Sequence, residues 1–129
     1  MNGLTTDKII FDTCWILDRI KDKTIATMPD KFPNNILYVS VITRMELYSY
    51  SDISEGETGQ INRLLERMTV LPFTDTIEQQ TIIFRKATNC KLPDSIIAAT
   101  AILIEATLLT SDTRFGKVKF GGLKIMLLG

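Results

Sequence analysis

Four acidic residues carry the possible chemistry of this chain. Asp12 follows the short apolar run Ile9–Phe11, and Asp112 follows the run Leu108–Thr110. Asp94 opens a long apolar segment that has the composition of a buried helix. Carboxylate oxygens are the ligands that Mg²⁺ and Mn²⁺ prefer. The positions of these acids, together with Glu46, therefore predict a site for a hard divalent cation.

The absence of histidine narrows the chemistry further. Without histidine there is no Ser-His or Cys-His nucleophile pair, no HExxH zinc site and no imidazole acid or base. The two cysteines, Cys14 and Cys90, match neither a disulfide framework nor a zinc pattern, which indicates a reduced cytoplasm. Cys14 is expected to be a small buried apolar residue. The net charge of zero argues against a strongly basic nucleic-acid binder but allows a small anionic-substrate site that contains a metal.

Size and composition indicate a single domain that spans residues 1–129. Hydrophobic residues make up 45% of the 129 residues and charged residues 23%, as in ordinary globular chains. The N-terminus is polar, so we expect no targeting segment. The longest uncharged apolar run, Ser95–Ile104, is about half of the roughly 20 residues that a membrane span requires. We therefore expect a cytoplasmic protein that does not bind a membrane.

Strand-like and helical runs alternate along the chain. Strands are expected at Ile9–Phe11, Ile36–Val39, Val70–Phe73, Leu108–Thr110 and Leu123–Leu128. Helices are expected at Thr13–Lys21, from the Ser40 N-cap to a point before Gly56, at Glu57–Met68, at Thr76–Asn89 and from Pro93 onward, with a polar connection between the first helix and the second strand. Pro72 suits an edge strand. The alternation predicts an α/β fold with a parallel sheet and helices on both faces.

This topology would bring the four acids together. Asp12 and Asp112 each end a strand, so both lie at the carboxyl edge of the sheet, where ligands bind in open α/β folds. A helix that leads into a parallel strand begins at that same edge, which places Asp94 there. Glu46 lies about six residues, or roughly 9 Å, along the helix after the second strand. A bound cation would relieve the repulsion among these carboxylates.

Each acid also has a local explanation. Asp12 could only cap the first helix, and Asp94 could only complement a helix dipole. Asp112 could be an ordinary turn residue. Glu46 could be an exposed helix residue. The common edge on which all four fall favours the joint interpretation.

Four segments carry a resemblance to a known family. They are IIFDTCWIL, VSVITRMELYSY, LPDSIIAATAI and LLTSDTRF, in that order along essentially the whole chain. They resemble the motifs of the PIN-domain family, and specifically those of its small VapC-type toxin ribonucleases. The resemblance implies a three-layer α/β/α fold with a central parallel sheet of about five strands. It also implies an Mg²⁺- or Mn²⁺-dependent endoribonuclease that cleaves RNA phosphodiester bonds with metal-activated water.

The resemblance also assigns roles to residues. Carried over by position, Asp12, Glu46, Asp94 and Asp112 form the catalytic, metal-binding quartet. Asp12 and Asp94 would bind the metal directly, whereas Glu46 and Asp112 would bind it directly or through water. Thr13 and Thr110 are candidates for supporting these ligands, although packing explains them as well.

One position departs from the family pattern. Many relatives carry a further acid where this chain has Arg114. A cation at that position would weaken a second metal site or contact the RNA backbone, so a single metal is favoured. Arg114, Lys117 and Lys119 form a small basic group near Asp112, which could equally be a solvated loop.

The toxin resemblance implies two protein partners. They are a cognate antitoxin that inserts a segment into the site or a groove, and a second copy of the chain in a homodimer. Apolar residues between Glu46 and Met68 could supply either interface, although core packing is the default.

The alternative to an enzyme is a catalytically silent PIN-like module that binds protein or RNA. A haloacid-dehalogenase-like phosphatase is excluded because Cys14 stands at its second aspartate position. A dinucleotide-binding domain is excluded because no glycine follows the first strand.

Overall fold

The computed structural model describes residues 8–129, and within them the chain forms one parallel five-stranded sheet. The strands are β1 (Lys8–Phe11), β2 (Ile36–Ser40), β3 (Thr69–Leu71), β4 (Thr107–Thr110) and β5 (Lys124–Leu127). Their spatial order is β3-β2-β1-β4-β5, and every neighbouring pair is parallel. The sequence-based fold class is confirmed. Strand β1 lies at the centre, with β2 and β4 on either side of it.

The register aligns the carboxyl ends of the central strands. Phe11 pairs with Leu109, and the amide of Asp12 donates to the carbonyl of Leu109 at 2.9 Å. The end of β1 is therefore held beside the end of β4 by backbone hydrogen bonds. This fixes the chain that carries Asp12 next to the chain that carries Asp112.

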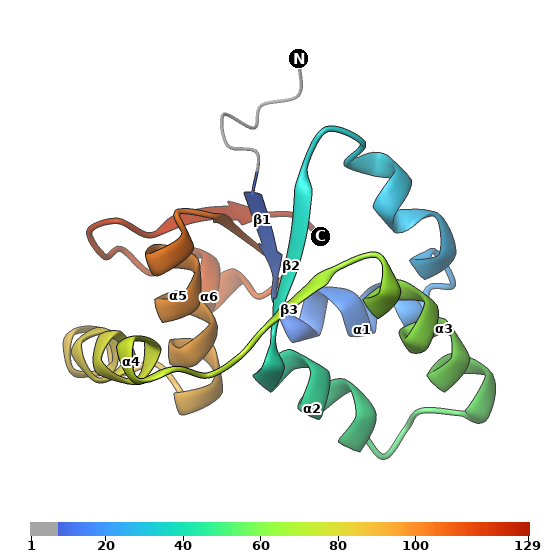
Figure 1. Cartoon of the computed structure of the whole chain (residues 1–129), viewed down its shortest axis with the longest axis horizontal. Coiled ribbons are helices and arrows are strands. Elements are labelled where there is room, and N and C mark those ends of the chain that lie inside the picture. The colour runs from blue at the N-terminus through green and yellow to red at the C-terminus, as the bar shows by residue number, and fades with distance from the viewer. Residues whose placement is uncertain (1–7) are drawn as a thin grey trace.

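Helices cover both faces of the sheet (Figure 1). One layer contains α1 (Thr13–Lys21), the 3₁₀ helix η1 (Ile25–Lys31), α2 (Val41–Ser49) and α3 (Glu55–Glu66). The other contains α4 (Asp75–Thr88), α5 (Leu92–Ile104) and α6 (Thr113–Gly116). Each layer has its own core: Phe11 and Leu109 face the first, whereas Ile10 and Leu108 face the second. Alternate strand residues thus point to opposite faces, as the period of a β-strand requires.

Helix α5 is the most deeply buried helix. Its residues from Ser95 to Ala101 are all buried, and Ala98 and Ala99 are completely inaccessible. Small side chains here allow the helix to lie close to both the sheet and α4. This confirms the expectation of a buried helix, and the packing fixes the helix end that carries Asp94.

The structure corrects several details of the sequence-based assignment. The connection expected between the first helix and β2 contains η1, which buries Ile25 and Met28. Helix α3 begins at Glu55 rather than Glu57, because Ser54 forms a reciprocal capping box with Glu57. Strand β3 ends at Leu71, before Pro72, and lies at the sheet edge as predicted.

Both cysteines are free thiols, as expected. Within the described part of the chain, no helix has the length and apolar character needed to cross a membrane.

The aromatic group at the end of β1 should dominate the stability of the first core. Phe11 is fully buried, with its ring centroid 5.3 Å from that of Trp15 and 5.6 Å from that of Phe32. We expect Phe11→Ala to lower the free energy of unfolding by about 3–5 kcal/mol, because it removes a large side chain and leaves a cavity. Phe73→Ala, at a residue 45% exposed, should cost less than about 1 kcal/mol in the same urea titration. Equal losses for the two variants would contradict this view of the core.

Candidate active site

Asp12 is a buried carboxylate at the junction of β1 and α1. It is only 4% exposed and is the N-cap of α1, with its Oδ1 accepting from the amide of Thr13 at 2.9 Å. Its Oδ2 accepts a hydrogen bond from the hydroxyl of Thr110 at 2.7 Å. The local explanation of Asp12 as a helix cap is therefore correct, but one oxygen also faces the end of β4.

Glu46 reaches the same edge from α2. Its side chain is half-buried, and its Oε1 accepts a hydrogen bond from the Thr13 hydroxyl at 2.7 Å. The Thr13 hydroxyl oxygen also lies 3.0 Å from that of Thr43, which is completely buried. The hydroxyl of Thr13, the residue directly after Asp12, thus connects the end of β1 to Glu46 on α2.

Asp112 stands where β4 gives way to α6. It is the N-cap of α6, with its Oδ1 accepting from the amides of Arg114 at 2.9 Å and Phe115 at 3.4 Å. Its own amide donates to Thr110 Oγ1 at 3.0 Å. Thr110 therefore contacts both Asp12 and Asp112.

Asp94 differs from the other three acids because its carboxylate has no hydrogen-bond or ion-pair partner among residues 8–129. It lies in the first turn of α5, behind Pro93. Burial raises the pKa of Asp94 to about 6, with further contributions from the negative charges of Asp12, Asp112 and Glu46. The carboxylates of Asp12, Glu46 and Asp112, which come from separate elements, are thus close enough to Asp94 for their charges to raise its pKa.

A thiol also lies against this cluster. Cys14 Sγ donates to Asp12 Oδ2 at 3.0 Å and lies 3.4 Å from Ser111 Oγ. Burial raises the pKa of the Cys14 thiol, as does the hydrogen bond to Asp12. The residue is therefore a neutral hydrogen-bond donor rather than a nucleophile at neutral pH.

The donor set of the cluster suits a hard cation, since it consists of carboxylate oxygens. Among residues 8–129, however, no three acidic or cysteine side chains already surround a common point closely enough to hold an ion. The hydrogen bonds explain this: Asp12, Glu46 and Asp112 are turned toward neighbouring hydroxyl and amide donors. The unpartnered, raised-pKa carboxylate of Asp94 is the observation that favours a cation, because a positive charge would relieve its repulsion.

A shallow cleft of about 240 Å³ opens beside two of the acids. Asp94 and Asp112 line it together with Lys91, Arg114 and Phe115. Lys91 was missed from the sequence, although it stands three residues before Asp94 at the N-cap of α5. Lys117 and Lys119, which the sequence grouped with Arg114, do not line this cleft. Larger grooves elsewhere on the described surface contain none of the four acids.

The fold and the acidic cluster together define a class: a three-layer α/β/α domain with carboxylates gathered at the carboxyl edge of its parallel sheet. The PIN domain family model matches residues 9–121. The chain belongs to the PIN domain family, a family of nucleases. No curated protein matches the sequence.

Solved structures show the same fold. One is VapBC2 from Rickettsia felis bound to a DNA fragment from its promoter, which matches with a TM-score of 0.77. The two chains are 20% identical, and the match covers 95% of this chain and 99% of that chain. DNA-bound VapBC from Salmonella typhimurium matches at 24% identity over 94% and 98% of the two chains, with a TM-score of 0.76. VapBC-1 from nontypeable Haemophilus influenzae matches at 24% identity over 93% and 97%, with a TM-score of 0.74.

The raised pKa of Asp94 predicts how stability depends on pH. Asp94 titrates near pH 6 when folded, against an ordinary value of 3.8. Between these values the folded chain binds more protons than the unfolded chain, so this residue's contribution to stability falls as pH rises through the window. In EDTA at pH 7.5, Asp94→Asn should raise the free energy of unfolding by about 1 kcal/mol, a value reduced for solvent screening at a half-buried group.

The gain should disappear near pH 3.5, where Asp94 is protonated in both states. Urea unfolding at both pH values measures it, with Asp52→Asn as the control at an exposed position. Destabilisation by Asp94→Asn at pH 7.5 would show that the carboxylate is not under repulsion.

Proposed function

We propose that this chain is an Mg²⁺- or Mn²⁺-dependent endoribonuclease and the toxin of a toxin–antitoxin pair. The proposal rests mainly on one observation: the charges of Asp12, Asp112 and Glu46 all act on Asp94. These four acids come from different elements of a PIN domain. Such mutual repulsion lowers stability, and carboxylates perturbed in this way are concentrated at binding and catalytic sites. The VapBC neighbours support the toxin–antitoxin part of the proposal through their common fold.

In this proposal the four carboxylates hold the cation, with Asp12 and Asp94 as direct ligands and Glu46 and Asp112 binding directly or through water. When bound, the ion would supply Lewis acidity and positive charge at the scissile phosphate. The Asp94 carboxylate would break no hydrogen bond on binding the cation, because it has no partner among the described residues. Thr110 and Thr13 hold Asp12 and Glu46 in place through their hydroxyl groups.

Proton transfer would fall to a carboxylate, because the chain has no histidine. The alternative, a silent PIN-like binding module, would not require the acids to be kept under repulsion.

A nuclease assay tests the enzyme. The purified chain should degrade single-stranded RNA in Mg²⁺ or Mn²⁺ but not in EDTA, and Asp12→Asn or Asp94→Asn should lower the rate at least about 100-fold. Asp52→Asn should cleave like the wild type. Equal cleavage by the wild type and Asp94→Asn would mean that the activity is a contaminant, and it would leave the binding module as the better explanation.

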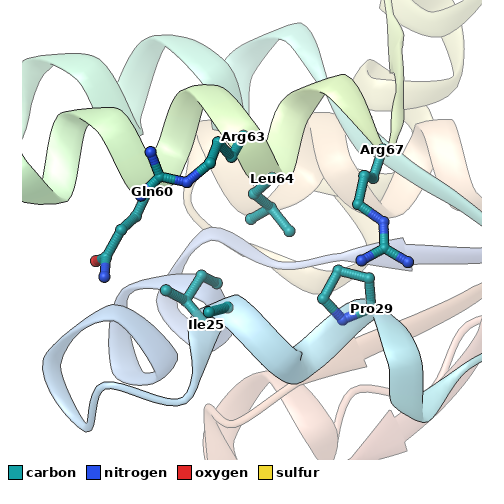
Figure 2. A pocket seen from close by; sticks show the side chains of 7 residues that line it. Ile25, Pro29, Gln60, Arg63, Leu64 and Arg67 are labelled. Atoms are coloured by element: carbon teal, nitrogen blue, oxygen red, sulfur yellow. The ribbon is translucent and has the colours of Figure 1, made fainter.

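The antitoxin is proposed to bind a groove of about 320 Å³ between η1 and α3. Ile25 and Pro29 of η1 and Leu64 of α3 line its apolar part, while Arg63 of α3 and Arg67, directly after that helix, extend beside it (Figure 2). Arg67 bonds Asp30 at 3.1 Å, but both side chains are more than half exposed, so this pair is weak. A partner segment with apolar residues would pack against the apolar lining, and acidic residues beside them would pair with the two arginines.

Filling the groove tests this contact. Ala26 is an exposed residue of η1 that lines the groove, so Ala26→Trp should obstruct it. We expect this variant to bind the product of the neighbouring antitoxin gene at least about 10-fold more weakly, a loss of roughly 1.4 kcal/mol. Its ribonuclease activity should remain that of the wild type.

Ala87→Trp, at an exposed position of α4, is the matched control and should bind normally. Undiminished binding by Ala26→Trp in titration calorimetry would place the antitoxin elsewhere.

We also propose a homodimer and a cytoplasmic location. Between Glu46 and Met68, Leu47 and Ile61 are buried and are explained by core packing, whereas Tyr48 and Tyr50 are 46% and 45% exposed. Ile82 and Ile83 of α4 are more than half exposed and are better placed to meet a second copy.

A further inference from the structure

Lys91 stands at a position where a cation is locally unfavourable. It is the N-cap of α5, it makes no side-chain capping hydrogen bond, and the positive end of the helix dipole disfavours its charge. Its ammonium group is exposed and makes no salt bridge within residues 8–129. Its charge does act on Asp94, whose pKa it lowers against the larger raising effects. Lys91 therefore offsets part of the negative charge at Asp94, and its exposed ammonium group is also accessible to a ligand.

Arg114 is a second cation on the same cleft. Its side chain is 84% exposed and its Nε lies 3.9 Å from Asp112 Oδ1, near the outer limit of an ion pair. Pairs of this kind contribute little to stability. The guanidinium is therefore available to a ligand, and it offers two parallel N–H donors of the kind that phosphate accepts.

The cleft joins these cations to the acidic cluster. Lys91 and Asp94 line it at the start of α5, and Asp112 and Arg114 line it at the start of α6. Carboxylates alone repel a polyanion, so an RNA strand that reaches them needs positive charge close by. Single-stranded nucleic acids are held mainly through their phosphates in such charged grooves.

We propose that Lys91 and Arg114 form a phosphate-binding subsite that holds the RNA backbone next to the scissile bond. The inference rests on the proposed ribonuclease function and assigns substrate-binding residues to it. Lys91 and Arg114 contact non-bridging oxygens of two phosphates, while the acids act on the neighbouring phosphodiester. Positive charge at the subsite offsets the repulsion between the acidic cluster and the approaching strand.

Salt-dependent binding tests the subsite without requiring cleavage. A fluorescent single-stranded oligoribonucleotide is titrated with the wild type and with the double variant Lys91→Gln/Arg114→Gln in EDTA, and anisotropy gives Kd over a series of salt concentrations. Each phosphate contact on a single strand contributes about 0.7 to the slope of log Kd against log salt. The double variant should lower that slope by about 1.4, which corresponds to about 25-fold weaker binding at 0.1 M salt.

Lys124→Gln is the control for the loss of a single surface charge far from the cleft. Lys124 is an exposed cation at the first residue of β5, at the opposite end of the sheet from the acids. Its removal changes the net charge of the chain by one but should leave the slope unchanged. Arg114→Lys in the otherwise wild-type chain should keep most of the slope, because the charge remains. Circular dichroism establishes that each variant is folded.

The outcomes separate this inference from the proposed function. A wild type that neither binds nor cleaves RNA overturns both. A wild type that binds and cleaves RNA, with a double variant whose salt slope equals that of Lys124→Gln, overturns the subsite alone. Unchanged RNA binding with a loss of antitoxin binding by the double variant also overturns it, since the two cations would then serve the protein partner.

Discussion

Repulsion among carboxylates at one edge of a parallel sheet is the constraint on which the rest of this structure depends. Burial of Asp94, followed by the negative charges of three other acids, raises its pKa to about 6, and its carboxylate has no hydrogen-bond donor among the described residues. A marginally stable domain keeps such an arrangement only if the fold holds it firmly. Here the holding elements are the central strands and the deeply buried α5.

Hydrogen bonds from threonine hydroxyl groups also orient the acids. Thr110 donates to Asp12 and accepts from the amide of Asp112, and Thr13 donates to Glu46. Each threonine is buried, so the donors are shielded from competing water. These contacts orient the carboxylates while leaving their charge intact. Among residues 8–129, no three acidic or cysteine side chains surround a common point closely enough to hold an ion.

The basic side chains illustrate the limit of reasoning from sequence spacing. Arg114, Lys117 and Lys119 are close in sequence, but only Arg114 lines the cleft beside Asp94 and Asp112. Lys91 joins it from another helix. Which cations face an acid depends on where α5 and α6 pack against the sheet, and no local pattern records that packing.

The sequence by itself determined the parallel α/β class, the strand ends at Asp12 and Asp112, and the edge to which Asp94 belongs, because strands that alternate with helices are joined by crossovers that make them parallel. It also excluded histidine chemistry. Only the tertiary structure decided that η1 replaces a loop, that Thr13 reaches Glu46 across 33 positions, and that Asp94 has no partner among the described residues. Those features depend on side chains that meet across the two helical layers and the sheet, and their meeting is set by packing rather than by sequence separation.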